Sequence, residues 1–279
     1  MALVPLLLTG VIAVGSHAAM AAATPAAAGA SGAKEKAKAP LGAAAIAALR
    51  TELASPDEPK AIAAAQKLGD SGTAAAAPVI AEVLAMGTTP PVAVEALSAL
   101  GRLKSPKAIQ VLTLYAGNRN EPVRKAAVQA LGALPDARVA GVLMERLGDA
   151  APEIRAAAAT ALAARHDDRA AARLFKLVAK NDAGAAAPLG TLIAANDVPR
   201  LAELRGQVDD AVLASALGEF LKRPNVADRL RIDVIRTLGR MPGAAATAAL
   251  AEYLTTIPEK DGRASKEEAQ KTLDARGGK

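Results

Sequence analysis

The stretch PVRKAAVQALGALPDARVAGVL, residues 122–143, decides the fold. Its first half places apolar residues at i, i+3, i+4, i+7 and i+8, on one face of an α-helix: Val123, Ala126, Ala127, Ala130 and Leu131. Pro135 and Asp136 break this pattern and can cap a new helix. A second apolar face then follows, made of Val139, Val142, Leu143 and Leu147. The stretch therefore predicts a hairpin of two helices.

The same text recurs along the chain. It aligns without gaps with PVAVEALSALGRLKSPKAIQVL (91–112) and EIRAAAATALAARHDDRAAARL (153–174), and LRIDVIRTLGRMPGAAATAAL (230–250) joins the set. A Leu followed by a small residue returns every 31 or 32 positions from Leu68 to Leu162. One short hairpin cannot bury its own apolar face, but stacked neighbours can. No segment alternates with the period of a strand, so we expect an all-α solenoid of about six hairpins.

These units resemble bacterial HEAT-like repeats, as in Pro122-Val123-Arg124 followed by Leu131-Gly132. The resemblance covers about residues 55–257 and implies an armadillo-like superhelix. Between 183 and 225 the phase breaks, and the stretch 209–222 indicates an irregular unit or an extra helix. The resemblance implies little about function, since such solenoids serve many roles.

Composition excludes several kinds of chemistry. The 279 residues include 74 Ala, two Phe, two Tyr, two His, and no Cys or Trp. Disulfides, thiolate catalysis and zinc–thiolate sites are therefore excluded. No phosphate-binding loop or Gly-x-Ser-x-Gly elbow is present. In His166-Asp167-Asp168, Asp167 is explained as a helix N-cap, because a metal site needs convergent ligands. We predict no catalytic residues, no metal site and no cofactor.

Both ends differ from the repeats. Residues 1–23 carry no charge, contain an apolar run from Leu3 to Val14, and end in small residues that suit signal-peptide cleavage, although the usual leading positive charge is missing. Residues 24–40 are a low-complexity Ala, Pro and Lys segment that predicts a disordered linker. The solenoid is then 41–257, and 258–279 form a polar tail. We expect a periplasmic or secreted protein; a membrane anchor, should the leader remain uncleaved, is the alternative.

A basic residue recurs every 31 positions, at the expected start of each second helix: Lys107, Arg138, Arg169 and Arg200. A cation there opposes the helix dipole, so something should compensate it. One interpretation is an Asp–Arg ladder between repeats that involves Asp136, Asp168 and Asp197. The other is a stripe that binds an acidic partner.

Two further sets recur. Arg124, Arg155 and Arg231 each follow an acidic residue (Glu121, Glu153 and Asp228), and the family resemblance implies a structural role for them. Tyr115 and Tyr253 are at equivalent positions on second helices, with Arg146 and Leu177 between them. Tyrosine is favoured at recognition surfaces, but the preferred interpretation of Tyr115 and Tyr253 is packing at the edge of the core with the hydroxyl in water. Phe175 and Phe220 are expected in the core.

The leading hypothesis is an exported, non-catalytic scaffold that binds a protein through the face lined by its second helices. The residues assigned to that face are Lys107, Arg138, Arg169, Arg200, Tyr115 and Arg146. A nucleic-acid binder with a basic face is one alternative, although the leader and the absence of Trp disfavour it. An enzyme subunit similar to the HEAT-like bilin lyases is the other, although no nucleophile or pigment pocket is evident.

Overall fold

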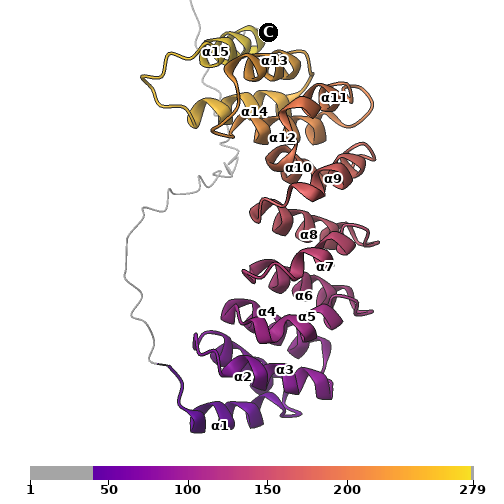
Figure 1. The fold of residues 1–279 in the computed structure, drawn as a ribbon, viewed down its shortest axis with the longest axis vertical. Helices are drawn as coiled ribbons and strands as arrows, with labels where there is room; N and C mark the ends of the chain where they lie inside the picture. Colours follow the sequence, from indigo (N-terminus) through magenta and orange to yellow (C-terminus); the bar gives the residue numbers. More distant parts are fainter. Residues whose placement is uncertain (1–39, 278–279) are drawn as a thin grey trace, which may run out of the picture. The chain divides into compact units, whose positions relative to one another are not determined.

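The computed structural model describes residues 40–277. The leader 1–23 and nearly all of the linker 24–40 lie outside the described residues. The described part is all helical and contains no strand, which confirms the fold class (Figure 1). The α-helices are α1 (Ala43–Leu53), α2 (Glu58–Gly69), α3 (Ala76–Met86), α4 (Pro90–Leu103), α5 (Ile109–Tyr115), α6 (Glu121–Ala133), α7 (Val139–Arg146), α8 (Pro152–Ala164), α9 (Ala171–Val178), α10 (Ala186–Leu192), α11 (Val198–Ala202), α12 (Asp210–Leu221), α13 (Asp228–Gly239), α14 (Ala244–Thr255) and α15 (Ala264–Gly277). Short 3₁₀ helices precede four of them: η1 (Pro106–Ala108), η2 (Asp168–Ala170), η3 (Ala183–Ala185) and η4 (Ala195–Asp197).

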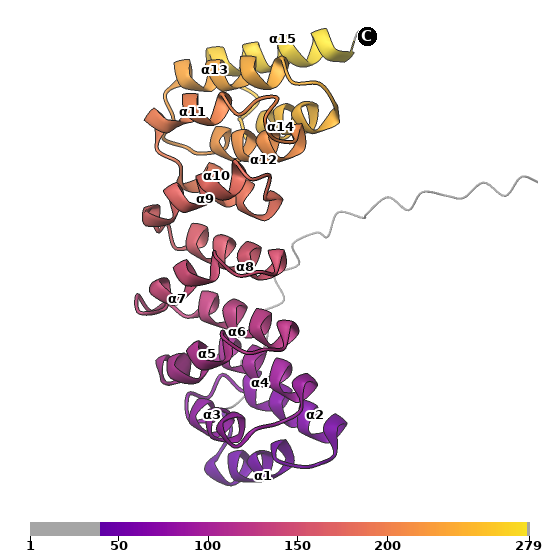
Figure 2. The ribbon, with the colours of Figure 1, turned by 90° about the vertical axis from the view of Figure 1, so that its right-hand side faces the viewer.

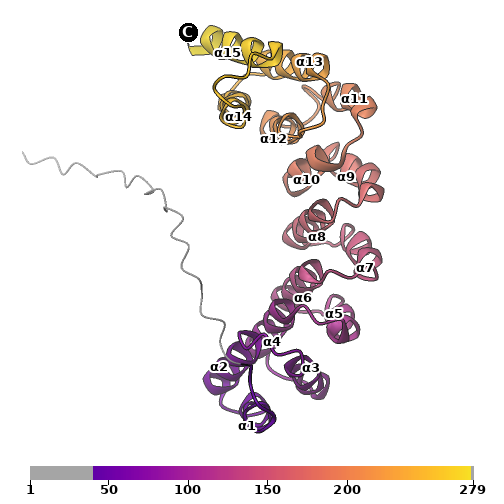
Figure 3. The ribbon, with the colours of Figure 1, turned by 60° about the vertical axis from the view of Figure 1, so that its left-hand side comes forward.

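The helices of residues 40–277 stack in two rows (Figures 2 and 3). In the first row α2, α4, α6, α8, α10, α12 and α14 pack each on the next. The second row holds the shorter helices α3, α5, α7, α9 and α11, which lie on the other side in Figure 3. The predicted hairpins are therefore confirmed from α2 to α11, with the first helix of each of these repeats in the first row.

Close packing in the first row depends on the small residue after the recurrent Leu. A methyl group added at Gly132 of α6 would lie 2.7 Å from Cβ of Ala161 on α8, and one at Gly101 of α4 would lie 3.0 Å from Cα of Ala130. The adjacent Leu100 and Leu131 are fully buried. Gly and Ala let the helix backbones approach closely, and the Leu side chains then fill the core between the rows.

The irregular region keeps the stacking but changes the alternation. Helix α12 is the extra helix expected near 209–222, and it lies between α10 and α14 in the first row. Helix α13, which aligns by sequence with the first helices, therefore does not take a place in their row and packs on α15 instead (Figure 3). The insertion of one helix shifts every later helix by one place.

The helical array extends past residue 257, the end predicted for the solenoid. Within the predicted polar tail, α15 packs on α13 and α14, so the helical array continues to residue 277. Only Ser265 and Ala269 of α15 are buried, and its outer side is polar. A helix of this kind closes the end of a solenoid without exposing apolar surface. No helix within residues 40–277 is both long enough and apolar enough to cross a membrane.

Candidate functional site

The four predicted basic residues lie where the repeat places them, at the starts of second helices. Lys107 is in η1, Arg138 directly precedes α7, Arg169 is in η2 and Arg200 is in α11. The three arginine side chains are 67%, 74% and 67% exposed. This prominent exposure leaves them available to a partner, as the binding interpretation requires.

Each of these arginines contacts an Asp of its own turn. The distances are 2.8 Å for Arg138–Asp136, 2.6 Å for Arg169–Asp167 and 3.7 Å for Arg200–Asp197. The Asp–Arg ladder between repeats is therefore wrong for this position, and Asp167 rather than Asp168 is the partner of Arg169. The guanidinium and backbone N–H of Arg138 lower the pKa of Asp136 to about 2. Hydrogen bonds from Arg169 likewise hold the pKa of Asp167 below its ordinary value, against the effect of burial.

A ladder between repeats does exist, at the second recurrent arginine. Arg124 on α6 donates two hydrogen bonds of 3.0 Å to Asp149, in the loop before α8. Arg155 on α8 pairs with Asp182, in the loop before α10, at 2.6 Å. Both arginines also donate to backbone carbonyls of the loop before their own helix. The structural role is confirmed, although the acidic partners come from the next repeat and not from the preceding residues.

In the irregular region, other residue types replace the Arg–Asp pairs that link successive repeats. The amide of Asn181 donates to the Asp209 carboxylate at 2.6 Å, and its oxygen accepts the Asp209 N–H at 2.8 Å. Further on, Arg231 is 5% exposed and donates to the carbonyls of Val226, Arg223 and Pro224. Asn181 thus links the loops before α10 and α12, whereas Arg231 holds the loop between α12 and α13.

Tyr115 and Arg146, predicted for the partner-binding face, make contacts inside the array. Side chains at or just after the C-terminal ends of helices donate to carbonyls at the helix ends of the preceding repeat. The pairs are Tyr115–Leu84, Arg146–Ala116, Arg165–Leu134 and Arg223–Ile193. The Tyr115 hydroxyl lies 2.7 Å from the Leu84 oxygen, and burial raises the pKa of Tyr115. Tyr253 is 1% exposed and its hydroxyl bonds Ser265. The interpretation that these hydroxyls lie in water is wrong.

The sequence analysis missed a basic face on α9. Arg169, Arg173, Lys176 and Lys180 follow one another at spacings of four, three and four residues, and all four are exposed. The helical turn persists to Lys180, whose N–H bonds the Leu177 carbonyl. These residues therefore share one face. We call this set the α9 basic face; the spacing is visible in the sequence and could have revealed it.

Three of these cations form no ion pair within residues 40–277. Only Arg169 has an acidic partner there, while Arg173, Lys176 and Lys180 have none. The equivalent residues one repeat earlier are Val142, Glu145 and Asp149, and those two repeats earlier are Val111, Leu114 and Asn118. Repeat packing therefore does not require cations at these positions.

A groove borders this face. We call it the α9–α11 groove; it has a volume of about 590 Å³ and is lined by Asp168, Ala171, Ala172, Phe175, Lys176, Leu192, Ile193, Ala194, Asp197, Arg200 and Arg223. Phe175 is half-buried in its wall, so only Phe220 is fully inside the core. The Arg200 guanidinium carbon lies 5.2 Å from the centre of the Phe175 ring, within the range of a cation–π contact. Lys176 and Arg200 thus connect the groove to the basic residues outside it.

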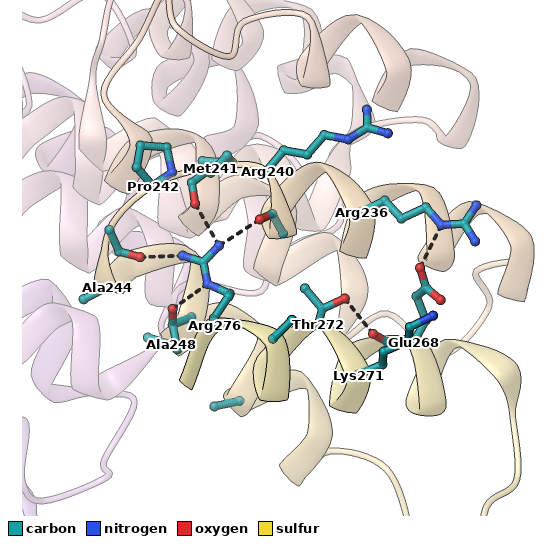
Figure 4. A pocket seen from close by; sticks show the side chains of 15 residues that line it. Arg236, Arg240, Met241, Pro242, Ala244, Ala248, Glu268, Lys271, Thr272 and Arg276 are labelled. Carbon is teal, nitrogen blue, oxygen red and sulfur yellow. Dashed lines mark hydrogen bonds and ion pairs between the residues drawn. The ribbon is translucent and has the colours of Figure 1, made fainter. Parts of the chain in front are cut away.

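A larger hollow lies at the C-terminal end, between α14, α15 and the turn after α13 (Figure 4). Its volume is about 1290 Å³. Arg276 lines the hollow. Its guanidinium donates to the Thr247 hydroxyl and to four carbonyls, those of Leu238, Gly239, Met241 and Gly243. Arg236 is paired with Glu268 at 2.8 Å. These contacts hold α15 against α13 and the α13–α14 turn. The polar groups that line the hollow are therefore explained by the packing of α15.

The turn at His166 and the acidic side chains of the described residues form no metal site. Within the described residues, no three His, Asp or Glu side chains lie close enough together to hold a metal ion. Asp167 accepts the Arg169 N–H as an N-cap of η2, which confirms its predicted role. The His166 backbone N–H donates to the Ala163 carbonyl, and the backbone there has a left-handed φ of 51°.

Comparison with known families identifies the repeat. The family model for HEAT repeats matches residues 46–132 and 114–187, together more than half of the chain. The chain is a HEAT-repeat protein. No curated protein matches this HEAT-repeat chain.

Solved structures share the helical architecture at low similarity. The complex of CpcE and CpcF of phycocyanin lyase from Nostoc sp. PCC7120 matches with a TM-score of 0.47 and 19% identity, over 82% of this chain and 94% of that one. An engineered protein matches with a TM-score of 0.45 and 20% identity, over 82% and 77%. Human deoxyhypusine hydroxylase, in complex with glycerol, matches with a TM-score of 0.33 and 22% identity, over 86% of each chain. Likeness at this level carries no argument about activity.

The HEAT-repeat architecture explains the presence of some of these side chains but not of others. Residues that hold successive repeats together, such as Arg124, Arg155 and Tyr115, are engaged in the stacking of the array. The cations of the α9 basic face form no ion pair between repeats within residues 40–277, although the Arg173 guanidinium lies against Gly148 of the preceding repeat. They are the part of this HEAT-repeat surface whose composition the architecture leaves unexplained.

Proposed function

We propose that this HEAT-repeat protein is a non-catalytic scaffold that binds a protein partner on its second-helix side, at α9. The observation that carries the proposal is the run of exposed cations Arg173, Lys176 and Lys180, which have no acidic partner in residues 40–277. Charged side chains that form no ion pair are available to steer and orient a partner. Arg138, Arg169 and Arg200 extend the same side of the array, though each is already beside an Asp.

The non-catalytic part of the proposal is supported by composition. The chain has no Cys and only two His, one of them at residue 17 in the proposed leader. Cys, a strong nucleophile, is therefore absent, and His, the side chain most often used as a general base, occurs once in residues 24–279. A binding surface needs only shape, charge and apolar area, all of which the α9–α11 groove offers.

We further propose that the protein is exported and works in the periplasm or outside the cell. The uncharged segment 1–23, with its apolar run and terminal alanines, supports this location. Mass spectrometry of the N-terminus, on protein recovered from fractionated host cells, tests it. A mature start near Thr24 in a soluble envelope fraction is the expected result, and an intact Met1 in the cytosol would contradict it.

Site-specific crosslinking tests the binding role. A photoreactive amino acid is placed at Lys176 in the full chain, and a matched one at Lys67, an exposed position on α2 in the first row. We expect a discrete crosslinked protein species from Lys176 and none from Lys67 in living host cells. Equal crosslinking at both positions would show that α9 is not a specific interface.

A further inference from the structure

We infer that the partner segment that binds at α9 is acidic and places an apolar side chain in the α9–α11 groove. This inference rests on the proposed protein-binding function and adds the chemistry of the bound segment. Its two halves come from separate observations, the charge of the α9 basic face and the aromatic wall of the groove beside it.

The spacing of the cations suits a short peptide. Arg173, Lys176 and Lys180 span about 10 Å along the helix at 1.5 Å per residue. In an extended chain, side chains on one side recur about every 7 Å. Two or three carboxylates on alternate residues would therefore face these cations, and Arg169 adds a fourth charge at the end of the face.

The groove supplies an apolar contact surface beside the basic residues. Ala171, Ala172 and Ile193 form small apolar walls around the half-buried Phe175 ring. Its volume of about 590 Å³ falls within the range of about 300–1,000 Å³ typical of small-ligand pockets. One or two aliphatic side chains could enter beside the ring, whose other neighbour is the Arg200 guanidinium. Buried apolar anchors beside charged contacts are the usual arrangement of a specific interface.

Acidic residues at the edges argue against a nucleic acid or an anionic membrane. Asp168 and Asp197 line the groove itself. Double-stranded DNA carries one charge per about 1.7 Å, so a duplex laid along α9 would meet these carboxylates. A peptide can place a neutral or apolar residue beside each of them. The mixed charge therefore favours a short acidic segment of a protein.

Defined peptides test the inference on the full-length protein. The probe is a labelled twelve-residue peptide of Asp and Glu with two Leu, compared with a peptide in which Asn and Gln replace the acids and with one in which Ala replaces Leu. Fluorescence anisotropy should show about tenfold tighter binding of the acidic Leu peptide than of either comparison peptide, with affinity falling as salt rises.

Matched variants locate the binding site. Arg173→Glu, Lys176→Glu and Lys180→Glu together should weaken binding of the acidic Leu peptide by about tenfold or more. The control Lys60→Glu, Lys67→Glu and Arg229→Glu changes the net charge equally at exposed positions elsewhere and should leave binding within about twofold, because distant exposed charges are screened. Ala172→Trp fills the groove without removing a core side chain. It should weaken binding of the Leu peptide and leave the Ala peptide unchanged.

Three outcomes would overturn the inference. The control triple variant could be as damaging as the α9 triple variant, which would mean that net charge alone attracts the peptide. A twelve-base-pair DNA duplex or a vesicle with anionic lipid could bind more tightly than the peptide and be lost with the α9 variants. Finally, a photoreactive residue at position 176 could crosslink a protein although no acidic peptide binds. The proposed protein-binding function would then be supported, and the inference that the bound segment is acidic would be refuted. Loss of crosslinking itself would remove the proposed function as well.

Discussion

The guanidinium of Arg124 on α6 grips the carboxylate of Asp149, in the loop before α8, through two hydrogen bonds of 3.0 Å. The two side chains are only 16% and 6% exposed. Asp149 also accepts the Ala151 N–H at the start of α8. Burial raises the pKa of Asp149, but the bonds from Arg124 and Ala151 outweigh it, and the pKa lies below its ordinary value. One ion pair thus links two repeats, and its carboxylate also holds the backbone directly before α8.

Arg124→Ala should lower the free energy of unfolding by about 1–3 kcal/mol, because the buried Asp149 carboxylate loses both guanidinium hydrogen bonds and the remaining cation beside it is the Arg146 guanidinium, 3.9 Å away. Urea denaturation followed by circular dichroism measures this. Arg138→Ala is the matched control: its side chain is 67% exposed and its partner lies in the same turn. That change should cost less than about 1 kcal/mol. Equal losses in the two variants would refute the assignment of Arg124 as an inter-repeat link.

Acid should destabilise the array through its aspartates. Asp136, Asp149 and Asp167 all have a folded pKa below the ordinary value, and that of Asp136 is about 2. A depressed folded pKa means that these carboxylates stabilise the fold fully above the unfolded value of about 4. The stabilisation is lost as the pH falls through the folded values. The urea midpoint should therefore decrease from pH 4 towards pH 2.

The triple variant Asp136→Asn, Asp149→Asn and Asp167→Asn separates this effect from general acid denaturation. It should be less stable than the parent protein at pH 6 and should lose less of its remaining stability between pH 4 and pH 2. A parallel decline of both proteins would assign the acid sensitivity to other groups.

The fold was predictable because each repeat carries its own signals. The break at Pro135-Asp136 and the caps at Asp57 and Asn120 act within one hairpin, and the Leu-Gly step recurs once in each of several repeats. Their consequences are local, so one sequence suffices to find them. The row taken by α13 was not predictable in this way. It depends on whether the insert α12 lies inside the stack, and that is decided by packing against α10 and α14.

The candidate site was predictable only in part. The positions of Arg138, Arg169 and Arg200 follow from the repeat period, but their pairing within the turn depends on side-chain rotamers. Arg124 and Asp149 are 25 residues apart, so sequence distance pointed to the nearer Glu121. The α9 basic face was visible as a helical spacing within one unit. A search for features shared by all repeats passes over such a feature.

Arg276 should control the docking of α15. Its guanidinium donates to four carbonyls of the α13–α14 turn and its Nε to Thr247 at 2.9 Å, while α15 itself buries little apolar surface (Figure 4). Arg276→Ala should therefore speed hydrogen exchange of α15 amides by about tenfold or more while α4–α8 stay protected, since local opening is governed by local contacts. Lys271→Ala, at an exposed position lining the same hollow, should leave exchange unchanged. Fast exchange in both variants would show that α15 is held by something else.

The glycines of the helices should divide into two classes. A methyl group at Gly190 of α10 would lie 2.8 Å from Cβ of Glu219 and would run into the backbone carbonyl of Ala216 on α12. Neither obstacle can move without shifting α12, so Gly190→Ala should lower the free energy of unfolding by about 1–3 kcal/mol. A methyl group at Gly141 of α7 would meet no atom within 4 Å. Gly141→Ala should therefore raise stability by about 0.5–1 kcal/mol, because Ala loses less backbone entropy in a helix. Urea titrations of the two single variants decide the matter. If Gly190→Ala stabilised the protein as Gly141→Ala does, the close approach of α10 and α12 would not be what holds the irregular region in the first row.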